Sequence, residues 1–273
     1  MILAGAIERV RSTVRPMLPR AIYQSFSEGV DTLTGVRRMG WTGYRRLRAT
    51  FRGHCDPESR LTSFTIPPIA HELWIRPGTP DGHSLVSSLI REDYGTFLPT
   101  GPVKLVIDAG GYIGDSAIWY LTRFPYAKVI SLEPDPLNFA LLQRNCVSYG
   151  SRATLLRAGI WPRDSHLKVI HCGDELTVEV QEVDAAQEYD VVGMSPLTLL
   201  EQAGESEIDI LKCNIEGAET ELFGSDCDAW LSCTRSIYVQ IHHSRAMESV
   251  MSATRRHGFS CRRHRYLHIF HRQ

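Results

Sequence analysis

A glycine-rich turn and an acid further along the chain could together hold a nucleoside. The turn, residues 108–114, reads Asp-Ala-Gly-Gly-Tyr-Ile-Gly, and Glu133 follows 19 residues after Gly114. Glycines let the backbone approach a ligand closely, and an acid at this distance can accept hydrogen bonds from both ribose hydroxyls. The turn alone fits an ordinary strand-to-helix link equally well, but the turn and the acid together favour an adenosine-containing ligand.

The spacing of the glycines separates two classes of adenosine cofactor. A dinucleotide fingerprint reads G-x-G-x-x-G, whereas residues 110–114 read Gly-Gly-Tyr-Ile-Gly. An acid two residues before the first glycine, here Asp108, is the common form in enzymes that use S-adenosylmethionine (SAM), where the turn cradles the methionine part. The turn therefore predicts SAM and disfavours a nicotinamide-dependent oxidoreductase.

Polar residues late in the chain could activate the group that accepts a methyl. His242 is the first candidate for a general base, because imidazole titrates near neutral pH; the alternative is a packed or surface histidine. Glu216, which shares a turn with Asn214, is the second candidate. Its alternative role is that of an acid favoured by a helix N-terminus. Lys212 either orients a carboxylate or the acceptor, or simply reaches solvent.

Alternating strands and helices are expected to position these residues. Each candidate falls at or just after the end of a predicted strand, and short links between strands and helices predict a parallel sheet covered on both faces. Ligands bind beyond the carboxyl ends of such strands. The expected strands are residues 103–108, 128–133, 153–160, 208–213 and 236–241, with helices at 116–124, 136–144 and 245–257, a β excursion at 166–192, and a closing hairpin near 258–261 and 266–271.

The chain divides into three predicted regions. Residues 1–60 form a basic helical extension, residues 61–100 supply short strands and a helix, and residues 101–273 form the SAM-binding domain. Residues 1–53 carry ten arginines against three acids, although the formal net charge of the whole chain is only −1. The basic helices could contact a membrane surface peripherally, but without a compact Lys/Arg run we favour solvated faces and expect no nucleic-acid partner.

The cysteines indicate the expected compartment. The chain has seven, an odd number, and none is spaced C-x-x-C. Such scattered thiols predict a reduced, cytoplasmic protein without a disulfide framework, and no Cys/His spacing predicts a metal site. No apolar run approaches the length that spans a membrane.

Several segments carry a more specific likeness. They are residues 73–81, 92–94, 108–114, 133–139, 145, 158–161, 208–219 and 240–242. Glu133-Pro134-Asp135-Pro136 and Ile215-Glu216-Gly217-Ala218-Glu219 are the most distinctive of these. Over residues 70–243 the chain resembles the FkbM family of SAM-dependent methyltransferases.

The resemblance implies a fold, an activity and a set of site residues. The fold is the α/β Rossmann-like fold of class I methyltransferases, a mainly parallel seven-stranded sheet with helices on both faces, here with a helical N-terminal extension. The activity is O-methylation of a hydroxyl on a sugar, glycan or polyketide-type natural product. The expected catalytic residues are His242, Glu216 and Asn214, and the expected cofactor contacts are Asp108, Gly110, Gly111, Tyr112, Gly114, Glu133, Pro134, Asn138 and Gly159.

Three positions depart from the family pattern. Tyr112 replaces the usual Asn of the turn, Asn214 replaces an Asp, and Gln240 replaces a Glu. Two of these changes turn an acid into its amide, which can neither take up a proton nor bind a cation as well. The alternative function is therefore a catalytically weak or inactive SAM-binding relative that acts as a binding or interaction protein.

Overall fold

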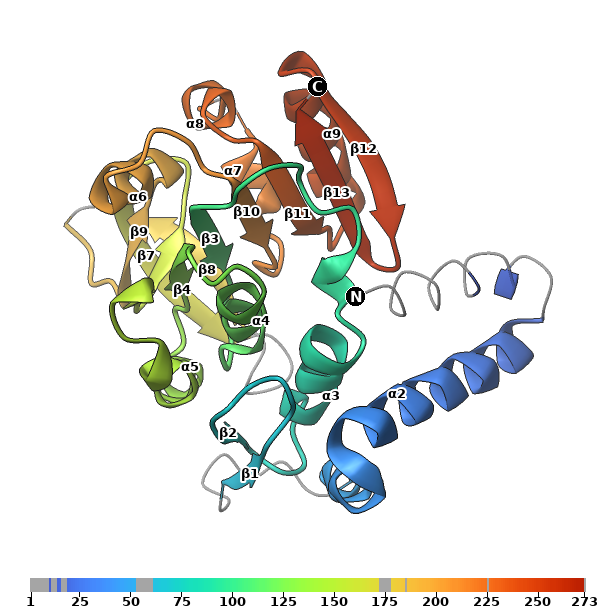
Figure 1. Ribbon diagram of the computed structural model, residues 1–273. Coiled ribbons are helices and arrows are strands. Elements are labelled where there is room, and N and C mark those ends of the chain that lie inside the picture. The colour runs from blue at the N-terminus through green and yellow to red at the C-terminus, as the bar shows by residue number, and fades with distance from the viewer. Residues whose placement is uncertain are drawn as a thin grey trace. The chain divides into compact units, whose positions relative to one another are not determined.

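The computed structural model describes residues 10, 14–15, 19–52, 61–171, 178–184, 186–224 and 226–272. The chain forms two compact units, residues 1–98 and 99–273 (Figure 1). Part of the expected N-terminal extension, including residues 1–9 and 53–60, lies outside the described residues. The predicted division at residues 60 and 100 stays a prediction. No described helix is both long enough and apolar enough to cross a membrane.

The first unit combines a long basic helix with a small hairpin. Helix α2 (Arg20–Ala49) bends at Gly40, whose φ of 72° suits glycine. Its Arg38 donates to the carbonyl of Leu89 and pairs with Glu92. The remaining elements are β1 (Thr62–Phe64), β2 (Leu73–Ile75), α3 (Asp81–Leu85), the π-helix η2 (Val86–Ile90) and the 3-10 helix η3 (Asp93–Gly95).

The segment 73–81, which contributes to the family resemblance, is built around a buried ion pair. The guanidinium of Arg76 donates to both carboxylate oxygens of Asp81 at 2.9 Å, and the backbone N–H of Arg76 donates to the same side chain at 2.8 Å. The Thr79 hydroxyl donates to the carbonyl of Arg76. These residues therefore fix the turn between β2 and α3.

The second unit is organised by a seven-stranded sheet with the order β12-β13-β11-β10-β3-β4-β5. The strands from β11 to β5 run parallel to one another, and β13 runs antiparallel to both of its neighbours. The strands are β3 (Leu105–Ala109), β4 (Lys128–Leu132), β5 (Ala153–Leu156), β10 (Ile210–Cys213), β11 (Ser236–Gln240), β12 (Phe259–His264) and β13 (Leu267–Arg272). This strand order confirms the class I methyltransferase fold and the closing hairpin.

Helices cover the two faces of the sheet. They are α4 (Asp115–Arg123), α5 (Pro136–Cys146), α6 (Pro196–Ala203), α7 (Glu219–Leu222), α8 (Asp228–Ser232) and α9 (Ser244–Arg256), and the 3-10 helix η4 (Val147–Arg152) follows α5. The main apolar core joins alternate sheet residues, such as Ile107 and Leu211, to Leu199, Trp230 and Val250 of the helices α6, α8 and α9. Because strand side chains alternate between faces, the intervening sheet residues, including Asp108, point to the other face.

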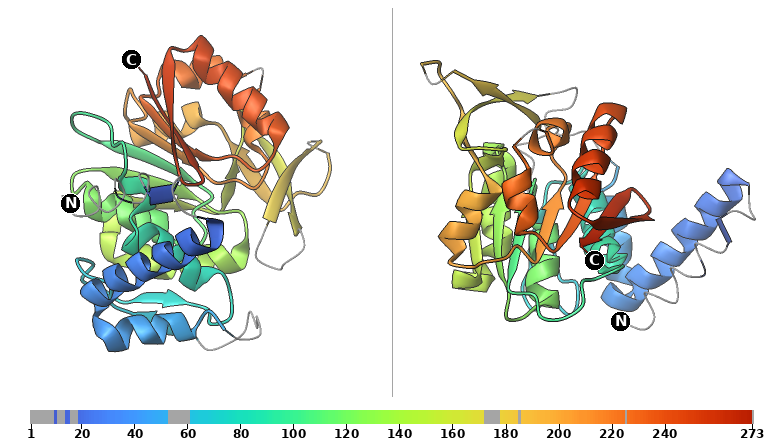
Figure 2. Two further views of the ribbon diagram at one scale, coloured as in Figure 1. Left: turned by 90° about the vertical axis from the view of Figure 1, so that its right-hand side faces the viewer. Right: turned by 90° about the horizontal axis from the view of Figure 1, so that it is seen from above.

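The structure departs from, or extends, the expected elements in three places. The strand expected at 153–160 is split at the bend of Arg157, whose guanidinium donates to the carbonyl of Asp190. Its second half, β6 (Ala158–Ile160), belongs to a separate sheet of order β6-β9-β7-β8, with β7 (Ser165–His171), β8 (Val178–Val183) and β9 (Val191–Met194). The expected β excursion is thereby confirmed, and its β7–β8 hairpin projects from the unit (Figure 2).

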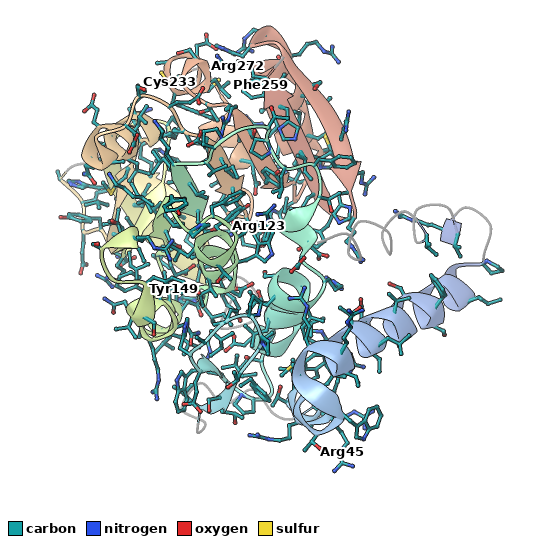
Figure 3. All side chains as sticks on the ribbon, in the orientation of Figure 1. Arg45, Arg123, Tyr149, Cys233, Phe259 and Arg272 are labelled. Atoms are coloured by element: carbon teal, nitrogen blue, oxygen red, sulfur yellow. The ribbon has the colours of Figure 1, made fainter. Side chains whose placement is uncertain are left out.

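The guanidinium of Arg272 lies 5.1 Å from the centre of the Phe259 ring in the closing hairpin (Figure 3).

The described cysteines fit the expectation of free thiols. Cys146, Cys213 and Cys227 are free and buried. Cys55 and Cys172 fall outside the described residues.

Candidate active site

A row of polar side chains crosses three strands directly below the glycine-rich turn. In the parallel register Lys212 lies opposite Asp108, and Asp108 lies opposite Ser131, so the three side chains share one face. The Lys212 ammonium lies 3.0 Å from Asp108 Oδ1, and Ser131 Oγ donates to Asp108 Oδ2 at 2.9 Å. Ser116 Oγ of α4 also donates to this carboxylate.

These contacts give Asp108 and Lys212 a role in holding the turn. Both side chains are almost fully buried. The Lys212 ammonium also donates to the carbonyl of Gly110 at 2.6 Å, so a buried cation joins strand β10 to the turn. Lys212 does not reach solvent, which excludes one of its two expected roles. Every contact described for the Asp108 carboxylate is internal, and its cofactor contact stays a prediction.

The turn itself needs glycine at three positions for reasons of packing and backbone conformation. Gly110 and Gly114 have φ of +77° and +89°, and a Cβ on Gly110 would lie 1.9 Å from the carbonyl oxygen of Asn214. A Cβ on Gly111 would lie 2.2 Å from Ser131 Oγ. From the sequence we expected these glycines to let the backbone approach a ligand. In the structure, Gly110 and Gly111 instead let the backbone of the turn approach the neighbouring strands. Tyr112 has φ of +49°, a conformation that Asn tolerates better than Tyr does.

Glu133 lies at the end of β4 and faces the turn. Its carboxylate accepts from the backbone N–H of Tyr112 at 2.8 Å and of Asp135 at 3.1 Å, and it receives a longer contact of 3.4 Å from the Asn138 amide. Asp135 also caps α5 by accepting from the N–H of Asn138. Pro134 is buried between these acids. The structure therefore brings the turn, Glu133, Pro134 and Asn138 together.

Burial sets the protonation of Glu133. Removal from water raises the pKa of Glu133 to about 7, against the opposing effect of the N–H donors of Asp135 and Tyr112. A raised carboxyl pKa stabilises the fold while the group is protonated, and this contribution is lost as the pH rises from about 4.5 to about 7. Glu133→Gln should remove this dependence, and urea unfolding of the two proteins between those pH values measures it.

Binding of an adenosyl ligand should release a proton from Glu133. Ribose hydroxyls donate to the ionised carboxylate and so lower its pKa, which predicts uptake of about half a proton by the buffer near pH 7. Calorimetric titration with SAM in buffers of different ionisation enthalpy measures this number. Glu133→Gln should bind more weakly and release none; an unchanged proton count in that variant would assign the release to another group.

Gly159 belongs to the separate four-stranded sheet. It is part of β6, and a Cβ there would lie 2.6 Å from Leu167 Cδ1 of β7. The structure therefore explains this glycine by the packing of two strands. Its expected contact with the cofactor stays a prediction.

A histidine and two glutamates form the second half of the site. His242 follows β11, and its Nδ1 lies 2.8 Å from Glu219 Oε1, while its Nε2 lies 3.4 Å from Glu216 Oε2. Glu219 is fully buried, whereas Glu216 keeps 35% of its side chain exposed. Glu219 Oε2 also accepts from the N–H of Gly217. Glu219 is not among the site residues expected from the sequence, although its type and its place in Ile-Glu-Gly-Ala-Glu were the available signals.

Glu216 does not begin the helix, as its alternative role at a helix N-terminus would require. It has φ of +48°, and α7 begins at Glu219 instead. A helix-terminus role therefore does not explain Glu216. Its left-handed conformation is uncommon for a residue other than glycine, and it turns the carboxylate toward His242.

The two glutamates determine the charge of His242. Burial lowers the pKa of the ring, but hydrogen bonds and charges of Glu216 and Glu219 outweigh this effect and raise the pKa of His242 to about 10. At neutral pH the ring is an imidazolium. Its expected role as a general base therefore requires that a bound acceptor first displace or neutralise a glutamate.

The amide at position 240 fits this charged state. Gln240 Nε2 lies 3.1 Å from His242 Nε2, and a protonated ring carries a hydrogen on that nitrogen. Two donors would then face each other, so the amide is assigned with its oxygen toward His242. Gln240 thus accepts from the imidazolium without adding a negative charge.

Asn214 connects the two halves of the site. Its N–H donates to the carbonyl of Ala109 at 3.1 Å, and its own carbonyl oxygen occupies the space next to Gly110. Its side-chain Oδ1 is buried and has no hydrogen-bond partner within the described part of the chain. Two residues later the same loop presents Glu216.

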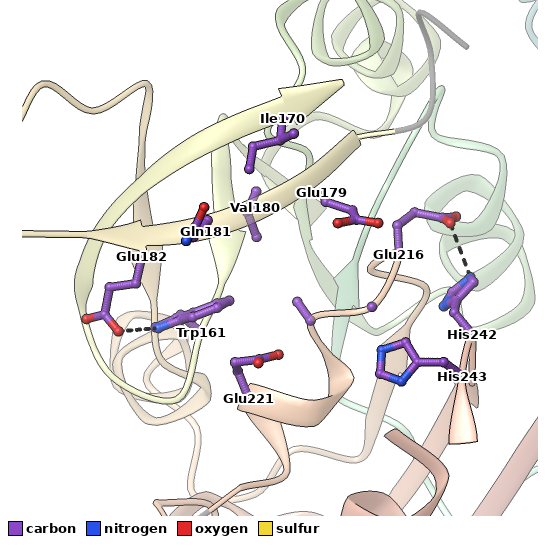
Figure 4. Close-up of a pocket in the computed structure, with 12 residues that line it drawn as sticks. Trp161, Ile170, Glu179, Val180, Gln181, Glu182, Glu216, Glu221, His242 and His243 are labelled. Atoms are coloured by element: carbon purple, nitrogen blue, oxygen red, sulfur yellow. Dashed lines mark hydrogen bonds and ion pairs between the residues drawn. The ribbon is translucent and has the colours of Figure 1, made fainter. Parts of the chain in front are cut away.

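A pocket of about 630 Å³ opens beside His242. Figure 4 shows its walls, which come from the β7–β8 hairpin, the end of β6, the loop before α7 and α7 itself, and the loop between β11 and α9. Trp161 is only 5% exposed but lines this pocket, and its indole N–H donates to Glu182 at 3.1 Å. The twelve lining residues are Trp161, Ile170, Glu179, Val180, Gln181, Glu182, Glu216, Gly217, Ala218, Glu221, His242 and His243.

The chain is similar to known methyltransferases. It is 24% identical over 150 residues to Methyltransferase 1 of Beauveria bassiana, covering 46% of this chain and 60% of that protein. A solved FkbM methyltransferase from Methylobacillus flagellatus overlaps 70% of this chain and 53% of its own, at 14% identity and a TM-score of 0.44. A precorrin-6y C5,15-methyltransferase from Geobacter metallireducens overlaps 64% of this chain and 84% of its own, at 11% identity and a TM-score of 0.38.

The family is established by a match to a domain profile. The profile described as the methyltransferase FkbM domain matches residues 108–261, more than half of the chain. This range includes the glycine-rich turn, Glu133, the Glu216–Glu219 loop and His242. The chain therefore belongs to the FkbM methyltransferase family, for which SAM is the implied methyl donor.

Proposed function

We propose that this chain transfers a methyl group from SAM to a hydroxyl of a small-molecule or glycan acceptor, such as a sugar, a glycan or a polyketide-type natural product. The observation that carries the proposal is the loop from Asn214 to Glu219. One end of this loop packs against Gly110 of the turn, and the other presents Glu216 and Glu219 to His242 beside the pocket. A cofactor half and an acceptor half are thus adjacent.

The residues at the strand ends suit an adenosyl cofactor. A carboxylate has about four acceptor positions, and Glu133 uses two of them for backbone N–H groups and receives a long contact from Asn138. It retains capacity for hydroxyl donors. The turn from Asp108 to Gly114 lies beside this carboxylate. When bound, SAM supplies a methyl group on a positively charged sulfur.

The acceptor half can orient a hydroxyl and take its proton. Glu216 is the better placed base, because its side chain is partly exposed and lines the pocket, and its Oε2 lies 3.4 Å from His242 Nε2. The buried Glu219 holds His242 Nδ1 and fixes the ring. The acceptor proton would pass to Glu216 Oε2, with the imidazolium of His242 stabilising the carboxylate before transfer.

Removing the carboxylate of Glu216 should therefore lower turnover. General acid–base groups contribute about 100- to 10,000-fold, so we expect Glu216→Gln to lower kcat by at least about 100-fold with SAM affinity unchanged. Transfer of a labelled methyl group to a panel of sugars and polyketide alcohols measures this effect. Glu201→Gln, on the exposed side of α6, is the matched control. Full kcat in Glu216→Gln, together with a loss in His242→Gln, would return the base role to His242.

A SAM-binding protein without turnover is the second candidate function. It is favoured by the amide of Gln240 and by the unpaired Oδ1 of Asn214, which both stand where the family has acids. If wild type transfers no label to any acceptor but the double variant Asn214→Asp/Gln240→Glu does, this second function is the correct one. Turnover by the wild type excludes it.

A further inference from the structure

The pocket beside His242 has a strongly negative lining. Four of its twelve residues are glutamates, and none is Lys or Arg. Glu182 is compensated from outside the pocket by Arg163, at 2.9 Å. Glu179 and Glu221 are both exposed, and the hydrogen bonds and ion pairs of the described residues give neither of the two carboxylates a partner. Two carboxylates therefore face the pocket without compensation.

The histidines do not cancel this charge. The imidazolium of His242 already lies between Glu216 and Glu219, so that group of three carries a net negative charge. His243 Nδ1 accepts from the N–H of Ala246 as the cap of α9, and this nitrogen therefore carries no proton. The pocket remains anionic at neutral pH.

The carboxylates surround one space and come from different elements. Glu179 lies on β8, Glu216 on the loop after β10, and Glu221 on α7; Figure 4 shows them on different sides of the same space. Like charges around a partly enclosed space repel one another, and low-dielectric walls strengthen their field. A positively charged group in that space relieves the repulsion.

The remaining lining favours an organic cation over a metal ion. Trp161, Ile170 and Val180 give the pocket an apolar wall, and aromatic and apolar walls suit the carbon skeleton of a ligand. In the part of the chain that the structure describes, no three His, Cys, Asp or Glu side chains are arranged to hold a metal ion. A volume of about 630 Å³ accommodates a ligand of several rings or sugar units.

We propose that the acceptor carries a protonated amine, seated between Glu179 and Glu221, and presents a hydroxyl to Glu216. The acceptor class is therefore a hydroxylated amine, such as an amino sugar or an amino-cyclitol, in place of a neutral sugar. This inference rests on the proposed methyl transfer, and it adds that Glu179 and Glu221 determine the choice of acceptor.

Matched pairs of ligands test the charge requirement directly. The probes are methyl glucosaminide, an amino-cyclitol and a hydroxylated phenethylamine, each paired with its N-acetyl derivative. Binding is measured calorimetrically on the full chain with S-adenosylhomocysteine present, and transfer is measured with labelled SAM. We expect at least one amine to bind about tenfold more tightly than its N-acetyl twin, and this difference to shrink as salt rises from about 0.05 to about 0.5 M.

Neutralising Glu179 and Glu221 should remove the preference for an amine over its N-acetyl derivative. An exposed ion pair contributes little on its own, so Glu179→Gln and Glu221→Gln should each weaken amine binding about two- to fivefold, and the double variant about tenfold. The N-acetyl twins should be unaffected, and Glu201→Gln should behave as wild type with both.

The outcomes separate this inference from the proposed function. Equal transfer to an amine and its twin overturns the inference and leaves the methyl transfer intact. Selective binding of an amine without any transfer overturns the proposed methyl transfer and supports the cation pocket. If no amine binds more tightly than its twin, or if the double variant keeps the preference, the inference is wrong.

Discussion

Gly110→Ala should abolish SAM binding and destabilise the fold. A Cβ at this position would lie 1.9 Å from the carbonyl oxygen of Asn214, and φ is +77°. The left-handed conformation costs about 1–2 kcal/mol, and forcing the backbone apart costs about 1–3 kcal/mol more. We expect a total loss of about 2–5 kcal/mol in the free energy of unfolding, measured with urea, and no saturable binding of SAM by calorimetry.

The variant Gly258→Ala separates the cost of the steric contact with Asn214 from the cost of the left-handed backbone conformation. Gly258 has a similar φ of +72°, but a Cβ there would meet nothing within 4 Å. This variant should lose only the conformational part, about 1–2 kcal/mol, and bind SAM normally. If both variants lose the same stability and both bind SAM, the approach of Asn214 to the turn has no functional role.

Lys212→Met should lower the stability of the fold and the affinity for SAM about as much as Gly110→Ala does, because Lys212 supports the same turn from strand β10. The ammonium pairs with Asp108 and donates to the carbonyl of Gly110, and both side chains are nearly inaccessible to water. Removing one member of a buried pair leaves an uncompensated charge and costs about 3–5 kcal/mol. We expect that loss in urea unfolding, together with at least a tenfold weaker affinity for SAM, because the turn loses its link to β10.

Neutralising the remaining carboxylate should recover part of the stability. The double variant Lys212→Met/Asp108→Asn removes the uncompensated charge, so its loss should be smaller than the sum of the single losses by about 1–3 kcal/mol. Lys168→Met breaks an exposed pair with Asp190 and should change stability by less than about 1 kcal/mol. Additive losses in the double variant would show that Lys212 and Asp108 act independently.

The sequence predicted the parts of this fold that depend on local pattern. The apolar runs at residues 105–109, 128–132 and 210–213 are buried strands, because each is short, rich in branched side chains and bounded by turn residues. Their alternation with helices was enough to predict a parallel sheet with polar residues at its carboxyl edge. The split at Arg157 could not be predicted, since both halves of residues 153–160 have the same β-type composition and only pairing with β9 separates them.

The candidate site was predictable only in part. The turn and Glu133 are close in sequence and follow strands, so their meeting at one edge could be expected. The environment of His242 could not, because its charge depends on a buried Glu219 and on the positive φ of Glu216. The pocket could not either, because the hairpin that forms one wall contacts the loop before α7 only in the folded chain.

The cofactor assignment is the central claim, and a calorimetric titration of the full chain with SAM and with NAD tests it most directly. We predict saturable binding of SAM at one site, its loss in Gly110→Ala, and no binding of NAD. Binding of NAD without binding of SAM would contradict the assignment.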